Sequence, residues 1–454
     1  MLNQDRGAKS VGQFRGKRFR GANGASSGTL THYLIIYFMI LFCQSCAYSA
    51  YLSNLVVELL VIAGFGAYLV IKDPPWSVYA FGFLLVDLII VISNRLLTGG
   101  TGLGPWADYS SFVIVAFVAV AYCPHKFVER FLNVMVSLAA ISLFCYAVQL
   151  LSPNLLLKLL PFSYDIGWTI GEWSNLYNQS MFSTVYVNGL LLYSFRSFDP
   201  MRNVGIFSEP ANYQIVLNIA ICLILFSRRC EGMPQNKKLG YLIVLILAVF
   251  SSGSTSGYLV LIAQLLVYLV FSQDCDDSNI RRSILLIGVI SIAALIGDYV
   301  VRGADSYLQQ ALISKIIGNT GSIDLSANTG RARIGTIQLG TSVMLDHPAG
   351  VGHEAFLKLR ALDGMAGGGG GLFALGAAEG VFAFLFIPFW TYLPLAMSNE
   401  RPLARILLIA VMLYCSLAQT YAITPIYAAL TALSLMDSTM SWSGVDRAKC
   451  EVNK

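Results

Sequence analysis

Residues 76–94, WSVYAFGFLLVDLIIVISN, form an apolar run whose only acidic or basic side chain is Asp87. A helix of roughly 20 apolar residues is long enough to cross the hydrocarbon core of a bilayer. Eleven comparable runs lie at 33–50, 53–71, 110–123, 131–151, 211–227, 239–252, 255–271, 283–300, 372–397, 403–419 and 421–437. The sequence therefore predicts an all-α integral membrane protein, a polytopic bundle of about 12 transmembrane helices.

The composition agrees with this class. Of the 454 residues, 56% are hydrophobic and 12% are charged, and the mean hydropathy is +0.65. Soluble domains have about 25% charged residues, so the chain is not a set of soluble domains. The net charge of +5 arises from basic residues at one side of the predicted bundle. It therefore does not indicate a nucleic-acid partner.

The distribution of Lys and Arg predicts the orientation. Twelve spans place both termini on one side, which then carries 20 of the 30 basic residues, whereas the short loops opposite carry only Arg95. Short cytoplasmic loops are enriched in Lys and Arg. We therefore expect a disordered basic cytoplasmic tail at 1–30, a single transmembrane domain at 31–437 and a second cytoplasmic tail at 438–454.

Two long loops, 152–210 and 301–371, then face the extracytoplasmic side. Neither contains any of the nine cysteines, so we expect no disulfides in them. The main ionisable residues within the spans are Glu58, Asp87 and Glu379. So small a set disfavours an ion-coupled transporter, and we expect the chemistry to lie in the two loops.

The first long loop ends just before a predicted helix. Pro210 suits the first position of that helix, which makes Glu209 its N-cap. An acid there is stabilised by the helix dipole. The alternative is that Glu209 points into an outward cavity near Arg202, and the residues leave both interpretations open.

The second long loop contains two predicted helices, at 303–317 and 330–346. On the second of these, Arg331 shares a polar stripe with Gly335, Gln338 and Ser342, whereas Arg333 falls almost opposite.

Two histidines, His347 and His353, follow the second helix. Pro348 and two glycines separate them, so they do not share one helical face as zinc ligands do, and we expect no metal. Cys43 and Cys46 form a CxxC pair inside a predicted span, where the simplest interpretation is two small apolar side chains in a helix.

Four motifs resemble, in their order and sidedness, the O-antigen polymerase and O-antigen ligase-like family of bacterial surface-polysaccharide enzymes. Arg202…Gly205-Ile206-Phe207-Ser208-Glu209-Pro210 is similar to that family's Arg-x-x-Gly-Phe-x-Glu-Pro segment. The Ser/Gly-rich turn at 251–257 resembles its turn between two spans. Arg331 or Arg333, followed by the segment 346–352 (DHPAGVG), resembles its Arg…His-Pro-x-Gly-x-Gly segment, and 378–382 (AEGVF) its Glu-Gly segment.

The resemblance implies a GT-C-like glycosyltransferase in the bacterial inner membrane that needs no metal or cofactor. It would polymerise oligosaccharide repeat units carried on polyprenyl pyrophosphate into O-antigen, capsule or exopolysaccharide, with a chain-length regulator and a repeat-unit flippase as possible partners. Arg202 and one of Arg331 and Arg333 would bind the pyrophosphate. Glu209, His347 or His353 would be the general base.

Two other functions remain open. A ligase would move finished polymer onto a lipid or protein acceptor, and an exporter or flippase would move lipid-linked sugars across the membrane. Apolar spans would hold the polyprenyl tail in any of these. Four aromatic residues of the first loop are candidates either for stacking on sugar rings or for an interfacial aromatic belt: Trp168, Trp173, Tyr177 and Tyr186.

Overall fold

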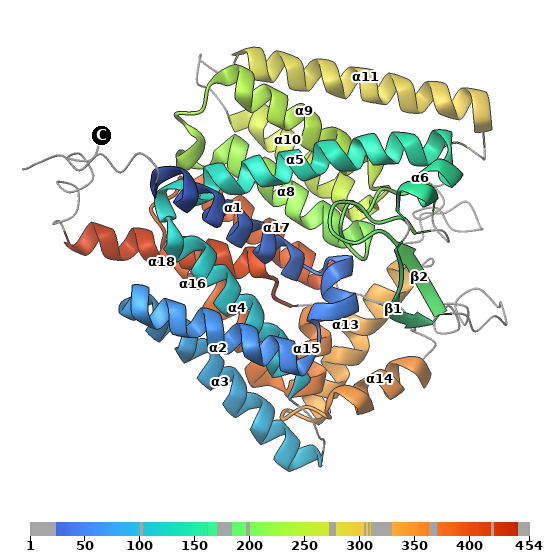
Figure 1. Cartoon of the computed structure of the whole chain (residues 1–454). Helices are drawn as coiled ribbons and strands as arrows, with labels where there is room; N and C mark the ends of the chain where they lie inside the picture. The colour runs from blue at the N-terminus through green and yellow to red at the C-terminus, as the bar shows by residue number, and fades with distance from the viewer. Residues whose placement is uncertain are drawn as a thin grey trace, which may run out of the picture.

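The computed structural model describes residues 24–99, 103–160, 162–169, 184–196, 200–271, 278–303, 306, 309, 329–362, 370–418 and 422–443. These residues are mostly helical (Figure 1). The all-α prediction is therefore confirmed in the main. The expected tail at 1–30 lies mostly outside the described residues, as does most of the expected helix at 303–317.

Each of the twelve expected spans overlaps helix, although the spans at 33–50 and 372–397 are each divided between two helical elements. The corresponding elements are α1 (Gly24–Phe42), α2 (Leu55–Lys72), α3 (Pro74–Thr98), α4 (Gly104–Tyr122), α5 (Pro124–Leu151), α8 (Pro210–Phe226), α9 (Gln235–Ser251), α10 (Thr255–Phe271), α11 (Ser278–Arg302), α15 (Gly371–Glu379), α16 (Val381–Ala396), α17 (Pro402–Ala418) and α18 (Pro425–Ser443). Among the described residues, α2, α3, α4 and α5 are long and apolar enough to cross a membrane, and several shorter helices are also apolar. The total of about 12 crossings stays a prediction.

The helix bundle has two ends, at which successive helices begin and finish. We call the loop end the one at which α3, α5, α9 and α17 finish and α4, α8, α10 and α18 begin; α5 ends there beside α6, at the right of Figure 1. The opposite end carries ion pairs between helix termini, among them Lys237 with Glu129 (3.7 Å) and Arg401 with Glu231 (2.9 Å). Apolar helices that finish in charged residues at one end are typical of a membrane protein.

Two helices form the centre of the bundle. Every residue of α4 from Tyr109 to Val120 is buried, and almost every residue of α8 is buried as well. α4 packs against α2, α3 and α18, and α8 packs against α9, α10 and α17. A helix that is apolar on all sides is buried on all sides, which explains their central positions.

The two long loops contain regular structure. In the first, α6 (Pro153–Leu159) leads to an antiparallel hairpin of β1 (Ser163–Thr169) and β2 (Thr184–Asn188). This hairpin is a departure from the all-α prediction. In the second, α13 (Thr329–Asp346) confirms the helix expected at 330–346, and α14 (His353–Leu362) follows it.

Candidate functional site

The first family-like segment folds onto the turn between α9 and α10. Arg202 Nε donates to the carbonyl of Ser252 (3.2 Å), and the backbone N–H of Asn203 donates to the carbonyl of Ser251 (2.9 Å). Gly253 has a positive φ of 62°, and a Cβ at this position would lie 3.0 Å from Cγ of Arg202. The motifs at 202–213 and 251–257 are therefore in direct contact.

Asn203 organises this segment. Its side-chain amide donates to the hydroxyls of Ser142 (3.2 Å) and Ser251 (2.9 Å), and its carbonyl oxygen accepts from the N–H of Gly205 (2.9 Å). Gly205 has a φ of 59°, and a Cβ there would lie 3.1 Å from the ring of Tyr213. A buried amide with all these partners fixes the backbone that carries Arg202.

A break in the first helix supports the same segment. The predicted span at 33–50 is not one helix: α1 ends at Phe42, and a π-helix covers Tyr48–Leu52. Between them, Cys46 N–H donates to the carbonyl of Ile206 (2.9 Å) and Ser208 N–H donates to the carbonyl of Gln44 (3.1 Å). These tertiary bonds interrupt the helix at 43–45, so the prediction of one continuous helix was wrong at Cys43, whereas Cys46 begins the next helical segment. Both cysteines are buried, and neither forms a disulfide.

Glu209 is the N-cap of α8, and Pro210 is the first residue of that helix, as predicted. The carboxylate makes no capping hydrogen bond, and the residue is half-buried. One turn further along α8, Gln214 packs against Gly257 of α10, where a Cβ would lie 2.9 Å from Cβ of Gln214. The Nε2 of Gln214 is buried and has no hydrogen-bond acceptor among the described residues.

Arg333 lies near this end of α8. Its charge acts on Tyr414 and Cys415 of α17, and Cys415 in turn lies beside Gln214. Nε of Arg333 is buried and finds no acceptor within the described part of the chain.

Tyr427, in the first turn of α18, also lies beside Cys415. We call Gln214, Arg333 and Tyr427, which all act on Cys415, the arginine cluster. Arg331 lies in the first turn of α13, and its side chain falls outside the described residues.

The two histidines lie far from the arginine cluster. Asp346 comes thirteen positions after Arg333 along α13, and at about 1.5 Å per residue the two lie roughly 20 Å apart. His347 and His353 follow Asp346, and both are exposed. A general base must approach its proton donor to about 3 Å. The structure therefore does not bring the histidines to Arg333, and Glu209, at the N-cap of α8, is the remaining base candidate.

The other two family-like motifs, 346–352 and 378–382, are joined by backbone hydrogen bonds, and we call this contact the interlock. The N–H groups of Val351 and Gly352 donate to the carbonyls of Ala377 and Ala378 (both 2.9 Å), and Val381 N–H donates to the carbonyl of Pro348 (2.9 Å).

Asn94 of α3 closes this interlock. Its amide donates to the carbonyls of Ala349 (2.7 Å) and Ala378 (2.9 Å). Here the predicted span at 372–397 is broken, because Gly380, with a φ of 100°, separates α15 from α16.

Beside the interlock lies a cavity of about 350 Å³, which we call the α3 cavity. Its wall includes Arg95, Thr98, Gly104, Gly352, His353, Glu354 and Lys358. Arg95 forms a 3.0 Å ion pair with Glu379, and both side chains are largely buried.

His353 keeps contact with solvent, but the protein atoms packed around its ring in the cavity wall desolvate it in part and lower its pKa; Arg95 lowers it further, while Asp108 raises it. From the sequence, Arg95 served only to predict the orientation. Its isolation could have marked it as a site residue, because no other basic residue occurs in the short loops on that side of the predicted bundle.

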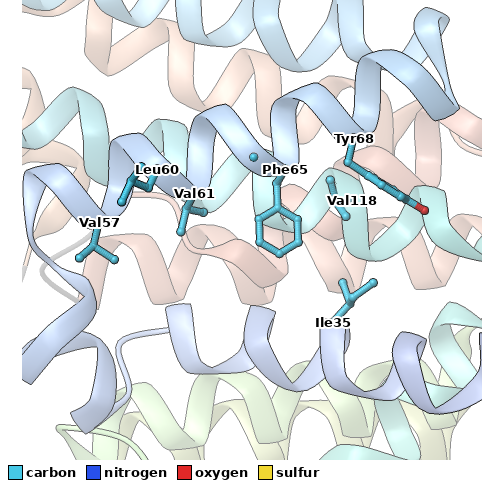
Figure 2. A pocket seen from close by; sticks show the side chains of 8 residues that line it. Ile35, Val57, Leu60, Val61, Phe65, Tyr68 and Val118 are labelled. Carbon is cyan, nitrogen blue, oxygen red and sulfur yellow. The ribbon is translucent and has the colours of Figure 1, made fainter.

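A third feature is an apolar groove of about 390 Å³ between α1, α2 and α4. Figure 2 shows the side chains of Val57, Val61 and Phe65 along α2, with Ile35 of α1 and Val118 of α4 opposite. No charged side chain lines the groove. Its chemistry suits a hydrocarbon chain.

The aromatic candidates of the first loop are not placed as a group. Trp168 belongs to β1 and Tyr186 to β2, and their side chains lie outside the described residues, as do Trp173 and Tyr177 entirely. Their role in stacking on sugars stays a prediction.

No family model, curated protein or solved structure matches the chain. The link to the O-antigen polymerase and ligase-like family therefore remains a resemblance of motifs.

Proposed function

We propose that this protein is a membrane glycosyltransferase that polymerises oligosaccharide repeat units carried on polyprenyl pyrophosphate. The observation that carries the proposal is Arg333, a half-buried residue whose Nε is buried and has no acceptor among the described residues. A buried guanidinium N–H without an acceptor costs free energy. Pyrophosphate would supply the missing acceptors, and a guanidinium binds it through a rigid fork.

The reaction needs two further groups. A hydroxyl oxygen of the acceptor sugar attacks the anomeric carbon of the donor, and the bond from that carbon to the pyrophosphate oxygen breaks. The bonding electron pair leaves with the pyrophosphate, where Arg333 and Arg202 stabilise the developing charge. The proton of the attacking hydroxyl passes to Glu209, which has no competing capping bond.

The apolar groove supports a lipid-linked substrate. It offers an uncharged surface along α2 for one hydrocarbon chain (Figure 2). Burial of such a chain is favourable by about 0.8 kcal/mol per methylene where the chain would otherwise face water.

A gel profile of surface and lipid-linked glycans from a deletion strain tests this function. Wild type should restore the polymer ladder, whereas Arg333→Ala should leave single repeat units on the final carrier. Loss of two charge-assisted bonds, at roughly 1.5–3 kcal/mol each, slows turnover about 10²-fold or more. Arg302→Ala is the matched control, because Arg302 is an exposed arginine paired only weakly with Asp298.

Two outcomes support the other functions. Full-length polymer stranded on polyprenyl pyrophosphate in the deletion strain would mean a ligase, which uses the same donor chemistry. Repeat units trapped on the cytoplasmic leaflet would mean an exporter, and the glycosyltransferase proposal would then be wrong.

A further inference from the structure

The α3 cavity is a second polar site, separate from the arginine cluster. Three elements meet there: the end of α3 with Arg95, the start of α4 with Gly104, and the first turns of α14 with His353, Glu354 and Lys358. Its volume of about 350 Å³ falls in the range of small-ligand pockets.

The charges around the α3 cavity balance. Three cations lie in or beside it: Arg95 and Lys358 in its wall and Arg360 on α14 facing His353. Three negative charges oppose them, from Glu354, Glu379 and the pair Glu58–Asp108.

That pair counts as one charge because of its hydrogen bonds. The single O–H of Tyr48 lies between an oxygen of Glu58 and an oxygen of Asp108. It can donate to only one of them, so the other carboxyl must hold a proton.

Asp87 of α3 lies near Glu379, and its Oδ2 is buried without a partner among the described residues; we count it as protonated, because an unpaired buried charge is costly. With His353 also neutral, three positive and three negative charges leave a net charge of zero.

A neutral site with strong donors and acceptors suits an uncharged polyol. Arg95 and Lys358 donate, whereas Glu354 accepts, as does the Thr98 hydroxyl, whose proton is already donated to the carbonyl of Asn94. Behind Arg95, the Oε2 of Glu379 is buried and has no partner among the described residues. A sugar presents hydroxyls that both donate and accept, whereas a pyrophosphate can only accept and would meet three carboxylate charges.

The position of the α3 cavity fits the proposed function, and the inference below rests on that function. α13 runs from Arg333 beside α17 to the interlock beside α3, a distance of roughly 20 Å. We propose that the α3 cavity is a subsite for an uncharged sugar residue of the oligosaccharide, several rings away from the bond that reacts beside Arg333.

Binding to the purified full-length protein in detergent tests the proposal without catalysis. One probe is the repeat-unit oligosaccharide, released by mild acid from the lipid carrier that accumulates in the deletion strain; the other is inorganic pyrophosphate. Lys358→Ala and Glu354→Gln alter exposed side chains and should not disturb folding. Loss of one hydrogen bond should weaken oligosaccharide binding about fivefold in each variant.

The matched control is Lys158→Ala, which removes an exposed lysine from α6. Support requires weaker oligosaccharide binding in the two cavity variants only, with pyrophosphate binding unchanged there and lost in Arg333→Ala. Oligosaccharide affinity equal to wild type in both cavity variants would overturn the proposal, as would wild-type protein that binds no oligosaccharide. Weaker pyrophosphate binding in Lys358→Ala would also overturn it, because the α3 cavity would then be an anion site. The glycan profile of the deletion strain tests the polymerase function independently.

Discussion

Substitution of Gly350 by alanine should destabilise the interlock between 346–352 and the Glu-Gly segment. Gly350 has a φ of 83°, and a Cβ there would lie 2.4 Å from the carbonyl oxygen of Ala378 and 2.6 Å from the nitrogen of Gly380. Both neighbours are backbone atoms, and real Cβ contacts are essentially never so short. The two segments must therefore move apart.

Gly352→Ala is the matched control. Gly352 has nearly the same φ, 85°, but the nearest atom to its added Cβ would be Oγ1 of Thr98 at 3.4 Å. A left-handed alanine costs about 1–2 kcal/mol, which is the whole cost expected at Gly352.

At Gly350 the displaced segments also lose some of the three interlocking backbone bonds. At about 0.5–1.5 kcal/mol per bond, the total cost there becomes roughly 3–5 kcal/mol.

Thermal unfolding of the purified variants in one detergent measures the difference. Both should unfold below wild type, and Gly350→Ala should unfold clearly below Gly352→Ala. Equal losses for the two variants would refute the interlock, because backbone strain alone would then explain both.

Three further outcomes are expected. Asn203→Ala should destabilise the fold by about 2–4 kcal/mol, because the hydroxyls of Ser142 and Ser251 lose their amide partner; unchanged thermal unfolding would contradict this. Glu209→Gln should abolish the polymer ladder and leave thermal unfolding unchanged, because the carboxylate makes no capping bond; a normal ladder would exclude it as the base. Since the folded-state pKa of His353 is lowered, the unfolded chain binds its proton more readily, so stability should fall as the pH drops below about 6.5. His353→Gln should reduce that fall in thermal unfolding measured at pH 7.5 and pH 5, and an unchanged pH dependence would contradict the argument.

The helices were predictable from the sequence wherever the backbone N–H and C=O groups bond to each other within one helix. α8 is one example: its residues are apolar almost throughout, and Pro210 marks its start. The prediction was wrong at 43–45, because the partners of the backbone around this break, Ile206 and Ser208, lie about 160 residues away in the sequence. Apolar periodicity contains no information about such long-range partners.

The site was predictable in part for the same reason. Arg202 and Glu209 were predicted as site residues from a local motif, and the structure places Arg202 against the α9–α10 turn and Glu209 at the N-cap of α8. Arg95 was not found as a site residue because its partner, Glu379, lies 284 residues further along the chain. His353 was grouped with the arginines, whereas the length of α13 keeps it apart.

The break after α1 has a consequence for biosynthesis. Backbone groups of Gln44 and Cys46 bond to residues 206–208, which the ribosome adds roughly 160 residues later. At about 5–20 residues per second, this delay lasts about 10–30 s. Unsatisfied backbone groups are costly in lipid, so the nascent first helix needs either a temporary partner, such as the insertion machinery, or a longer helix that unwinds when the loop arrives.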